Sequence, residues 1–159
     1  MRVHRAVFLD KDGTLIRDNP YRAWKPVILP GVVEGIDLLR RRGFILVVVT
    51  NQSGIAKGLT TEAELEAQRI ELVNALGPLA WYYCPHANGC ECRKPKPGLL
   101  IRAADDLDID LHYSWMVGDK QTDMEAGYAA GCRKTLVRAG QFLHAARDIG
   151  SDRIAPPQH

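Results

Sequence analysis

The sequence predicts a three-layer α/β fold, in which helices cover both faces of a parallel sheet. Short apolar runs rich in Val, Ile and Phe, typical of buried strands, alternate with amphipathic stretches typical of helices. Several of these runs end in polar residues, and parallel sheets bind ligands at the carboxyl ends of their strands. At 159 residues the chain is long enough for a substantial core, so we expect one domain over 1–159.

The composition is that of an ordinary globular protein, with 46% hydrophobic and 25% charged residues. A formal net charge of +2 is too small to favour nucleic acid or an anionic membrane as a partner. No apolar run is long enough to span a bilayer, and the N-terminal segment lacks the cleavage site of a signal peptide. We therefore expect a cytoplasmic monomer that binds neither nucleic acid nor membranes.

The first strand is expected over Ala6 to Leu9, and the DKDGT motif follows it directly. Asp10 and Asp12 are so close that their charges repel, unless a cation lies between them or they share a proton. A bound Mg²⁺ would meet this need and would also screen an incoming phosphate. One carboxylate could then attack phosphorus while the other passes a proton to the leaving oxygen. Taken alone, the motif is equally consistent with an acidic turn.

The segment from Leu15 to Pro30 is expected to be a connector, because it holds three prolines and no clean periodicity. Its polar and aromatic side chains could contact a substrate or could merely cover the sheet. These side chains are Asp18, Asn19, Tyr21, Arg22, Trp24 and Lys25.

Helices are expected over 31–42 and from Thr60 or Thr61 to Leu76, with glycines ending both. Strands are expected over 44–49 and 79–83. The residues expected to face the core are Val32, Val33, Ile36 and Leu39 in the first helix, and Leu65, Ile70, Val73 and Leu76 in the second.

The strand over 44–49 is followed by polar residues at its carboxyl end, as the first strand is. Its members are Thr50, Asn51, Gln52 and Ser53. A Thr hydroxyl and adjacent backbone N–H groups suit phosphate oxygens without adding charge. Thr50 or Ser53 could also cap a helix, and the two roles are compatible.

Four potential metal ligands lie within nine positions, and they are Cys84, His86, Cys90 and Cys92. Three thiolates and one imidazole form a closed tetrahedral set, which is typical of structural zinc. We expect this zinc to fix the loop over 84–92, and thereby to aim Arg93 and Lys94 at a phosphate group. Lys96 is expected to be a solvated surface lysine, and Cys132 a small buried residue.

A helix over 99–107 and a strand over 115–117 are expected next, and the strand again ends in acid at Asp119. Asp119 would complete an oxygen-rich Mg²⁺ site with Asp10. Asp123 could orient metal-bound water or cap the following helix, which is expected over 124–130. A fifth strand over 134–138 and a flexible tail over 150–159 complete the prediction.

The ordered set of motifs resembles the haloacid dehalogenase-like phosphatases, whose fold is Rossmann-like. The motifs are DKDGT, an apolar run with TNQSG, RKPKPG and GDKQTD. Within that superfamily the chain is similar to the histidinol-phosphate and heptose-bisphosphate phosphatase group, which carries a zinc loop before RKPxPG. The resemblance implies Mg²⁺-dependent removal of the 7-phosphate of a heptose 1,7-bisphosphate through an aspartyl-phosphate, with histidinol phosphate as the alternative substrate.

The resemblance also implies a role for each matched residue. Asp10 is the nucleophile, Asp12 is the general acid and base, and Thr50 and Lys94 steady the phosphoryl group. Mg²⁺ is held by Asp10, by Asp119 and by the backbone carbonyl of Asp12, with Asp123 behind them. The implied substrate contacts are Asp18, Asn19, Pro20, Tyr21, Asn51, Gln52, Ser53, Arg93 and Lys120.

The chain departs from the family pattern in two places. Only three residues separate His86 from Cys90, so the metal loop is short. The gaps between the motifs leave no room for the cap domain that many relatives carry, so we expect an open site. A zinc-ribbon module that binds nucleic acid is the alternative from another class, and the near-neutral net charge argues against it.

Overall fold

The computed structural model describes residues 2–18 and 25–151, and it confirms the predicted parallel α/β architecture. Five parallel strands pair in the order β3-β2-β1-β4-β5. They are β1 (Ala6–Leu9), β2 (Ile45–Asn51), β3 (Ala80–Cys84), β4 (Trp115–Gly118) and β5 (Arg133–Leu136). The chain reverses its direction of travel across the sheet between β3 and β4, so the carboxyl ends of β1, β2 and β4 are neighbours.

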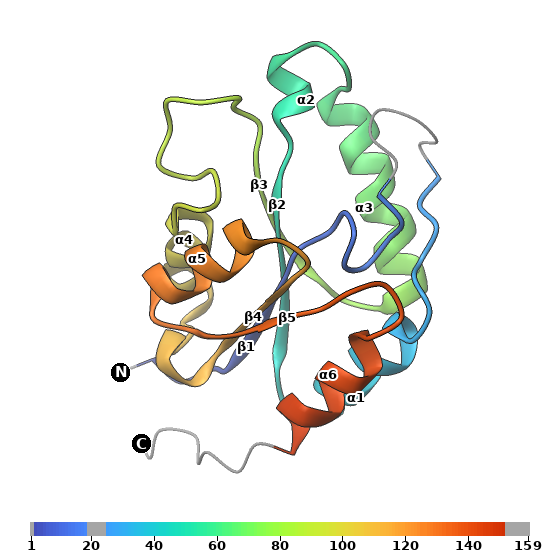
Figure 1. The fold of residues 1–159 in the computed structure, drawn as a ribbon, viewed down its shortest axis with the longest axis vertical. Helices are drawn as coiled ribbons and strands as arrows, with labels where there is room; N and C mark the ends of the chain where they lie inside the picture. Colours follow the sequence, from blue (N-terminus) through green and yellow to red (C-terminus); the bar gives the residue numbers. More distant parts are fainter. Residues whose placement is uncertain (1, 19–24, 152–159) are drawn as a thin grey trace.

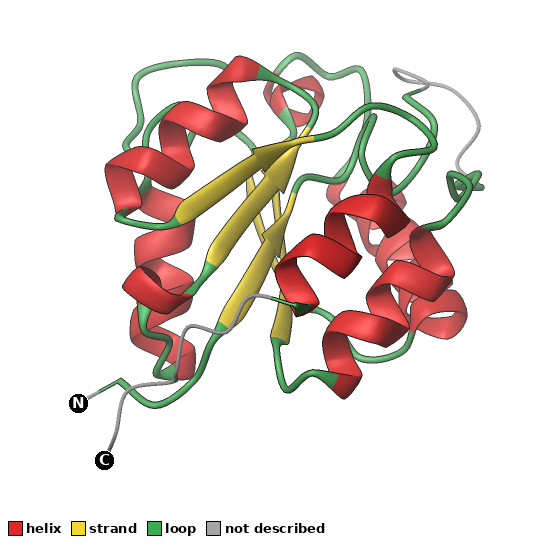
Figure 2. Cartoon of the chain, turned by 60° about the horizontal axis from the view of Figure 1, so that its bottom comes forward, coloured by secondary structure: helices red, strands yellow, loops and turns green. Residues whose placement is uncertain are grey.

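Helices cover both faces of the sheet, as Figures 1 and 2 show. One face is covered by α1 (Val32–Arg41), α3 (Glu62–Leu76) and α6 (Phe142–Gly150), and the other by α4 (Gly98–Leu107) and α5 (Gln121–Ala130). The short helix α2 (Ser53–Ala56) follows β2, and the 3-10 helix η1 (Leu111–Tyr113) precedes β4. No second sheet and no inserted cap domain occur within residues 2–18 and 25–151.

The core consists of two clusters, one on each face of the sheet. Along β1, Val7 and Leu9 point into the cluster beneath α1 and α6, whereas Ala6 and Phe8 point into the cluster beneath α4 and α5. This alternation follows from strand geometry, in which successive side chains lie on opposite faces. Because both faces are covered, the strand is apolar throughout its length, which is why it reads as a continuous apolar run in the sequence.

Helix α6 was not predicted from the sequence, although it packs closely against α1. A Cβ atom built on Gly35 of α1 would lie 2.5 Å from Cδ1 of Phe142 in α6, so the contact depends on glycine. Two of the four buried residues of α6, Ala145 and Ala146, are alanines that give a weak apolar periodicity. Gly150, where the flexible tail was expected to begin, is the last residue of α6, and residues 152–159 lie outside the described residues.

Two residues predicted to face the core are exposed instead. Val33 is 47% exposed and Ile70 is 48% exposed. In α1 the buried residues are spaced by three or four positions, and this spacing turns Val33 away from the sheet. In α3 the buried position belongs to Leu72 rather than Ile70.

The start of α3 is as predicted, because the Thr61 hydroxyl accepts a hydrogen bond of 3.1 Å from the backbone N–H of Glu64. The alternative role of Thr50 or Ser53 as a helix cap is wrong: α2 has Gln52 in the cap position, without a side-chain hydrogen bond to the helix. Thr50 belongs to β2. Among the helices described, none combines the length and apolar character needed to cross a bilayer.

Candidate active site

Three carboxylates from distant parts of the chain converge at the carboxyl edge of the sheet. Asp10 follows β1, Asp119 follows β4, and Asp123 lies in the first turn of α5. One oxygen from each lies within 4.8 Å of the others. Parallel pairing of β1 with β4 brings this about, because Asp10 N–H donates to Val117 O at 3.0 Å and so aligns the two strand ends.

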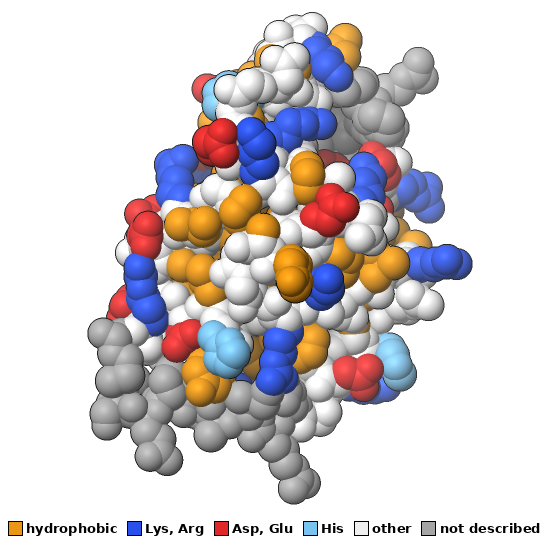
Figure 3. Space-filling model, turned by 60° about the vertical axis from the view of Figure 1, so that its left-hand side comes forward, with side chains coloured by type: hydrophobic (Ala, Val, Ile, Leu, Met, Phe, Trp, Pro, Cys, Tyr) orange, Lys and Arg blue, Asp and Glu red, His pale blue; other side chains and the backbone are white. Residues whose placement is uncertain are grey.

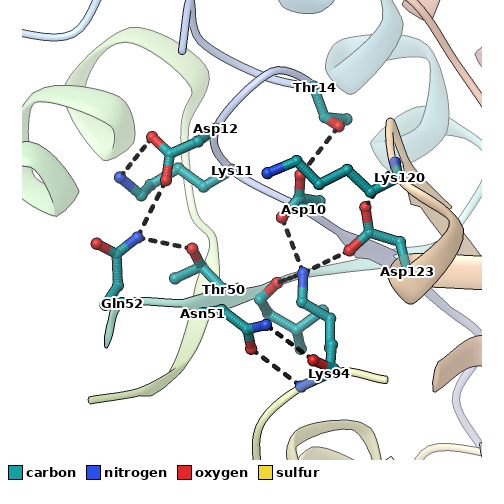
Figure 4. Close-up of polar contacts among 11 residues, drawn as sticks. Asp10, Lys11, Asp12, Thr14, Thr50, Asn51, Gln52, Lys94, Lys120 and Asp123 are labelled. Carbon is teal, nitrogen blue, oxygen red and sulfur yellow. Dashed lines mark hydrogen bonds and ion pairs between the residues drawn. The ribbon is translucent and has the colours of Figure 1, made fainter. Parts of the chain in front are cut away.

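The ammonium group of Lys94 lies among these carboxylates (Figure 4). Its Nζ is 2.8 Å from Asp10 Oδ1, 2.6 Å from Asp123 Oδ1 and 2.9 Å from Val49 O. Burial works to lower the pKa of Lys94, but the charges of Asp10 and Asp123 outweigh it, so the pKa is raised. The lysine is therefore charged, and it partly neutralises the acidic group.

Asn51 holds the segment that carries Lys94. Its Nδ2 donates to Lys94 O, and its Oδ1 accepts from Lys94 N, both at 3.0 Å. This pair of hydrogen bonds locks the loop after the cysteine cluster onto the end of β2. The amide of Asn51, predicted to contact substrate, is thus used by the protein itself.

Asp119 has the features of a metal ligand. Burial, then the neighbouring carboxyl of Asp10, raises its pKa to about 7. Its Oδ1 is buried, and no donor among the described residues reaches it. A Cβ atom on Gly13 would lie 2.2 Å from Asp119 Oδ2, and Gly13 has a φ of +86°, so only glycine permits this approach. Carboxylates that repel one another, with one buried oxygen that no donor reaches, suit a hard divalent cation.

Asp123 has two contacts that fix its position. Its Oδ2 accepts from the backbone N–H of Lys120 at 3.1 Å, so Asp123 caps α5. Capping was one of the two roles considered for Asp123 from the sequence. Its Oδ1 pairs with Lys94. Burial raises the pKa of Asp123, and Lys94 opposes this shift.

The Asp12 carboxylate points away from the carboxylates of Asp10 and Asp123 (Figure 4). Its Oδ1 accepts from Lys11 Nζ at 3.0 Å, and its Oδ2 accepts from Gln52 Nε2 at 3.1 Å. The same Gln52 nitrogen donates to Thr50 Oγ1 at 2.8 Å. This orientation leaves the Asp12 side chain outside the carboxylate cluster and next to Thr50, the next-to-last residue of β2.

The four predicted zinc ligands converge at the end of β3. Cys84 Sγ lies 3.0 Å from Cys92 Sγ, 3.5 Å from Cys90 Sγ and 3.5 Å from His86 Nδ1. Although burial opposes the shift, the backbone N–H of Arg93 and the neighbouring thiols lower the pKa of Cys90 to about 6, which favours the thiolate that metals bind. Burial raises the pKa of Cys84 to about 12. The donor set fits a closed tetrahedral site.

The remaining predicted residues lie around this edge. Arg93 is half-buried, and its Nη1 is buried without a hydrogen-bond partner among residues 2–18 and 25–151. Ser53 begins α2, Lys120 precedes α5 and is exposed, and Asp18 is exposed. Asn19, Pro20 and Tyr21 lie outside the described residues.

Three residues of the site were not identified from the sequence. Thr14 Oγ1 donates to Asp10 Oδ2 at 3.3 Å, and Lys11 and Gln68 contact each other beside Asp12. Thr14 and Lys11 belong to the DKDGT motif, and this position is the only feature of the sequence that could have identified them as site residues. Gln68 comes from α3, and no sequence pattern links it to the motif.

Comparison with known proteins places the chain in a family. The HAD-hydrolase-like family model matches residues 91–157. The D-glycero-beta-D-manno-heptose-1,7-bisphosphate 7-phosphatase of Salmonella typhi is 41% identical over 168 residues, which cover 94% of this chain and 88% of that protein. The enzyme of the same name from Escherichia coli K12 is 42% identical over 166 residues, with coverage of 94% and 87%. The chain belongs to the haloacid dehalogenase-like phosphatases.

A solved structure of this family has the same fold. The D,D-heptose 1,7-bisphosphate phosphatase of B. bronchiseptica, solved with magnesium and phosphate, superimposes with a TM-score of 0.78 at 33% sequence identity. The match covers 92% of this chain and 87% of that one. As a haloacid dehalogenase-like phosphatase, the chain is an enzyme that hydrolyses phosphate esters.

Proposed function

We propose that this phosphatase removes the 7-phosphate of D-glycero-beta-D-manno-heptose 1,7-bisphosphate. The names of relatives with 41% and 42% identity across nearly the whole chain support this substrate and its beta anomer. The observation that carries the chemistry is the position of Lys94 Nζ between Asp10 and Asp123, beside Asp119. An acidic nucleophile and a fixed cation at one sheet edge suit transfer of a phosphoryl group.

Two displacements at phosphorus make up the reaction. An oxygen of Asp10 attacks phosphorus, the bond to the ester oxygen breaks, and Asp12 gives its proton to that oxygen as the sugar leaves. Water then attacks the phosphoryl group on Asp10 and passes a proton to Asp12, and the bond from phosphorus to Asp10 breaks. Lys94 and the Thr50 hydroxyl stabilise the negative charge on the transferring oxygens in both steps.

Magnesium fits the acidic cluster. The side chains of Asp10 and Asp119 and the backbone carbonyl of Asp12 would hold it, with Asp123 behind them. When bound, Mg²⁺ screens the charge of the phosphate from the charge of the Asp10 carboxylate. The buried, donor-free Oδ1 of Asp119 and the magnesium in the related B. bronchiseptica structure both support this assignment.

Zinc is the structural metal of the proposal, and Cys84, His86, Cys90 and Cys92 hold it. Four protein ligands leave no position for a reacting water, so the zinc takes no part in hydrolysis. Its role is to rigidify the loop that leads into Arg93 and Lys94. The hydrogen bond of 2.9 Å from Lys96 Nζ to Cys90 O also holds this loop.

The substrate is held by groups around the edge of the sheet. Arg93, with its unpartnered buried nitrogen, and Lys120 are the cations for the phosphate groups. The other assigned contacts are Asp18, Asn19, Pro20, Tyr21, Gln52 and Ser53. Asn51 acts indirectly, because both polar atoms of its amide are bonded to the Lys94 backbone.

Acidic and basic side chains are interspersed on the face over α4 and α5 (Figure 3), so that face offers no basic patch for a polyanion. Cytoplasmic location and the monomeric state stay predictions.

The test is a rate comparison with Mg²⁺ present. The substrates are both anomers of the heptose 1,7-bisphosphate, fructose 1,6-bisphosphate and histidinol phosphate. The proposal predicts the highest kcat/KM for the beta anomer, and phosphorus NMR should show the 1-phosphate retained in the product. A higher kcat/KM for histidinol phosphate, or loss of the 1-phosphate, would contradict it.

A further inference from the structure

We propose that Lys11, anchored by Gln68, is a positioning residue for the proton-transferring Asp12. This inference rests on the proposed function and extends it to two residues to which no role has been assigned. Lys11 Nζ lies 3.0 Å from Asp12 Oδ1 and 2.6 Å from Gln68 Oε1. The three side chains form a short chain of contacts that joins the DKDGT motif to α3.

The burial of Lys11 indicates that the side chain has a function. Its side chain is only 2% exposed and is among the largest fully buried side chains of the described residues. Lysine is rarely buried, because removing an ammonium group from water costs free energy unless it is paired. A buried ion pair is weak evidence for added stability, since well-packed apolar residues often serve as well. The pair with Asp12 is therefore better explained by what it does to Asp12.

Gln68 keeps the ammonium group in place from a separate element. Gln68 lies in α3, 57 residues from Lys11 in the sequence, and its Oε1 accepts from Nζ. The lysine is thus held between the helix and the Asp12 carboxylate and is not free to swing toward solvent. Because α3 packs on the core through Leu65, Leu72 and Leu76, the anchor is rigid.

Lys11 makes the two carboxyl oxygens of Asp12 differ in their ability to carry a proton. An ammonium group can only donate hydrogen bonds, so Oδ1 stays an acceptor whenever Lys11 is in place. The proton that Asp12 gives to the leaving oxygen must then be on Oδ2, which lies 3.1 Å from Gln52 Nε2 and beside Thr50. Lys11 thereby selects both the oxygen that carries the proton and the direction in which it points.

The proton transfer itself balances without any further reactant. As the phosphorus–oxygen bond to the sugar breaks, the proton on Asp12 Oδ2 moves to the departing oxygen. In the second step the attacking water gives its proton back to Oδ2. Lys11 exchanges no proton and touches no reacting atom. Its loss should therefore slow the reaction only when the leaving group needs a proton.

The experiment compares two leaving groups in Lys11→Met. The sugar oxygen is strongly basic and needs the proton, whereas p-nitrophenolate is weakly basic and leaves without it. For the heptose bisphosphate, we expect kcat to fall about 100-fold, the lower end of general acid catalysis, with KM nearly unchanged. For p-nitrophenyl phosphate, the rapid burst of p-nitrophenolate, which reports attack by Asp10, should change less than about threefold.

Three further variants make the result specific. Lys11→Arg keeps the charge and should recover most of the loss. Gln68→Leu, a change at a half-buried helix position, should give a smaller loss with the same leaving-group dependence. Lys134→Met removes an exposed lysine on β5 and should change neither rate. Thermal unfolding of each variant separates a loss of activity from a loss of folded protein.

The outcomes distinguish this inference from the function on which it rests. Equal losses for the two esters in Lys11→Met and Gln68→Leu would overturn the positioning role and leave the phosphatase assignment intact. Full activity of both variants would do the same. If the wild-type chain hydrolysed neither ester, the proposed function would fail and the inference would fail with it.

Discussion

Lys94 Nζ lies 2.8 Å from Asp10 Oδ1, although the two residues are 84 positions apart in the sequence. Both side chains are buried, and Asp123 Oδ1 pairs with the same ammonium group at 2.6 Å. The loop after the cysteine cluster supplies the lysine, and β1 supplies the acid. The site therefore depends on two segments whose relative position is fixed by Asn51 and by the proposed zinc.

The first prediction concerns stability. Lys94→Met leaves the buried Asp10 and Asp123 charges without a partner, so the free energy of unfolding should fall by about 3 kcal/mol without added Mg²⁺. Lys57→Met, at an exposed lysine that follows α2, should change it by less than about 0.5 kcal/mol. Urea denaturation of the two variants measures the difference. Similar losses in both would argue that the Lys94 contacts contribute little.

The second prediction concerns the approach of Gly13 to Asp119. In Gly13→Ala the new methyl group would meet Asp119 Oδ2 at 2.2 Å, so Asp119 must move and kcat should fall about 100-fold.

Gly43→Ala is a matched control, because Gly43 has a φ of +88° but nothing within 4 Å of the added Cβ. It should lose about 1 kcal/mol of stability and keep its kcat. The dependence of kcat on Mg²⁺ concentration should be shifted to higher concentrations only in Gly13→Ala. An unchanged Mg²⁺ dependence in Gly13→Ala would contradict the assignment of Asp119 to the metal.

The third prediction concerns zinc. Cys92→Ser removes one ligand, so the purified protein should lose its zinc, and activity should fall about tenfold or more as Arg93 and Lys94 lose their fixed loop. Cys132→Ser is the control: Cys132 lies outside the cluster, and burial raises the pKa of its thiol to about 12. It should keep both zinc and activity. Elemental analysis with a rate assay tests this, and full activity in zinc-free protein would refute the role given to the loop.

The convergence of the acidic groups could be predicted from the sequence because it follows from topology. Asp10 and Asp119 each follow a strand of a parallel sheet, Thr50 is the next-to-last residue of another, and such strands end at the same edge. The cysteine cluster was equally visible, since four potential metal ligands lie within nine positions.

The sequence could not show which way each side chain turns. Asp12 faces Lys11 and Gln52. Gln52 follows β2, and Gln68 of α3 holds Lys11, so neither glutamine is local to the motif. Helix α6 was missed because half of its buried residues are alanines. Val33 and Ile70 were placed wrongly because several apolar stripes fit the same short helix, and only packing selects one.

The fourth prediction tests the central claim, that Asp10 carries the phosphoryl group. The enzyme would be mixed with substrate and Mg²⁺, quenched in acid within the first turnover, digested and analysed by mass spectrometry. We expect one phosphoryl group on the peptide that contains Asp10, and neither that group nor turnover in Asp10→Asn, because an amide oxygen cannot replace the carboxylate as nucleophile. Phosphate on a different residue, or normal turnover by Asp10→Asn, would contradict the account.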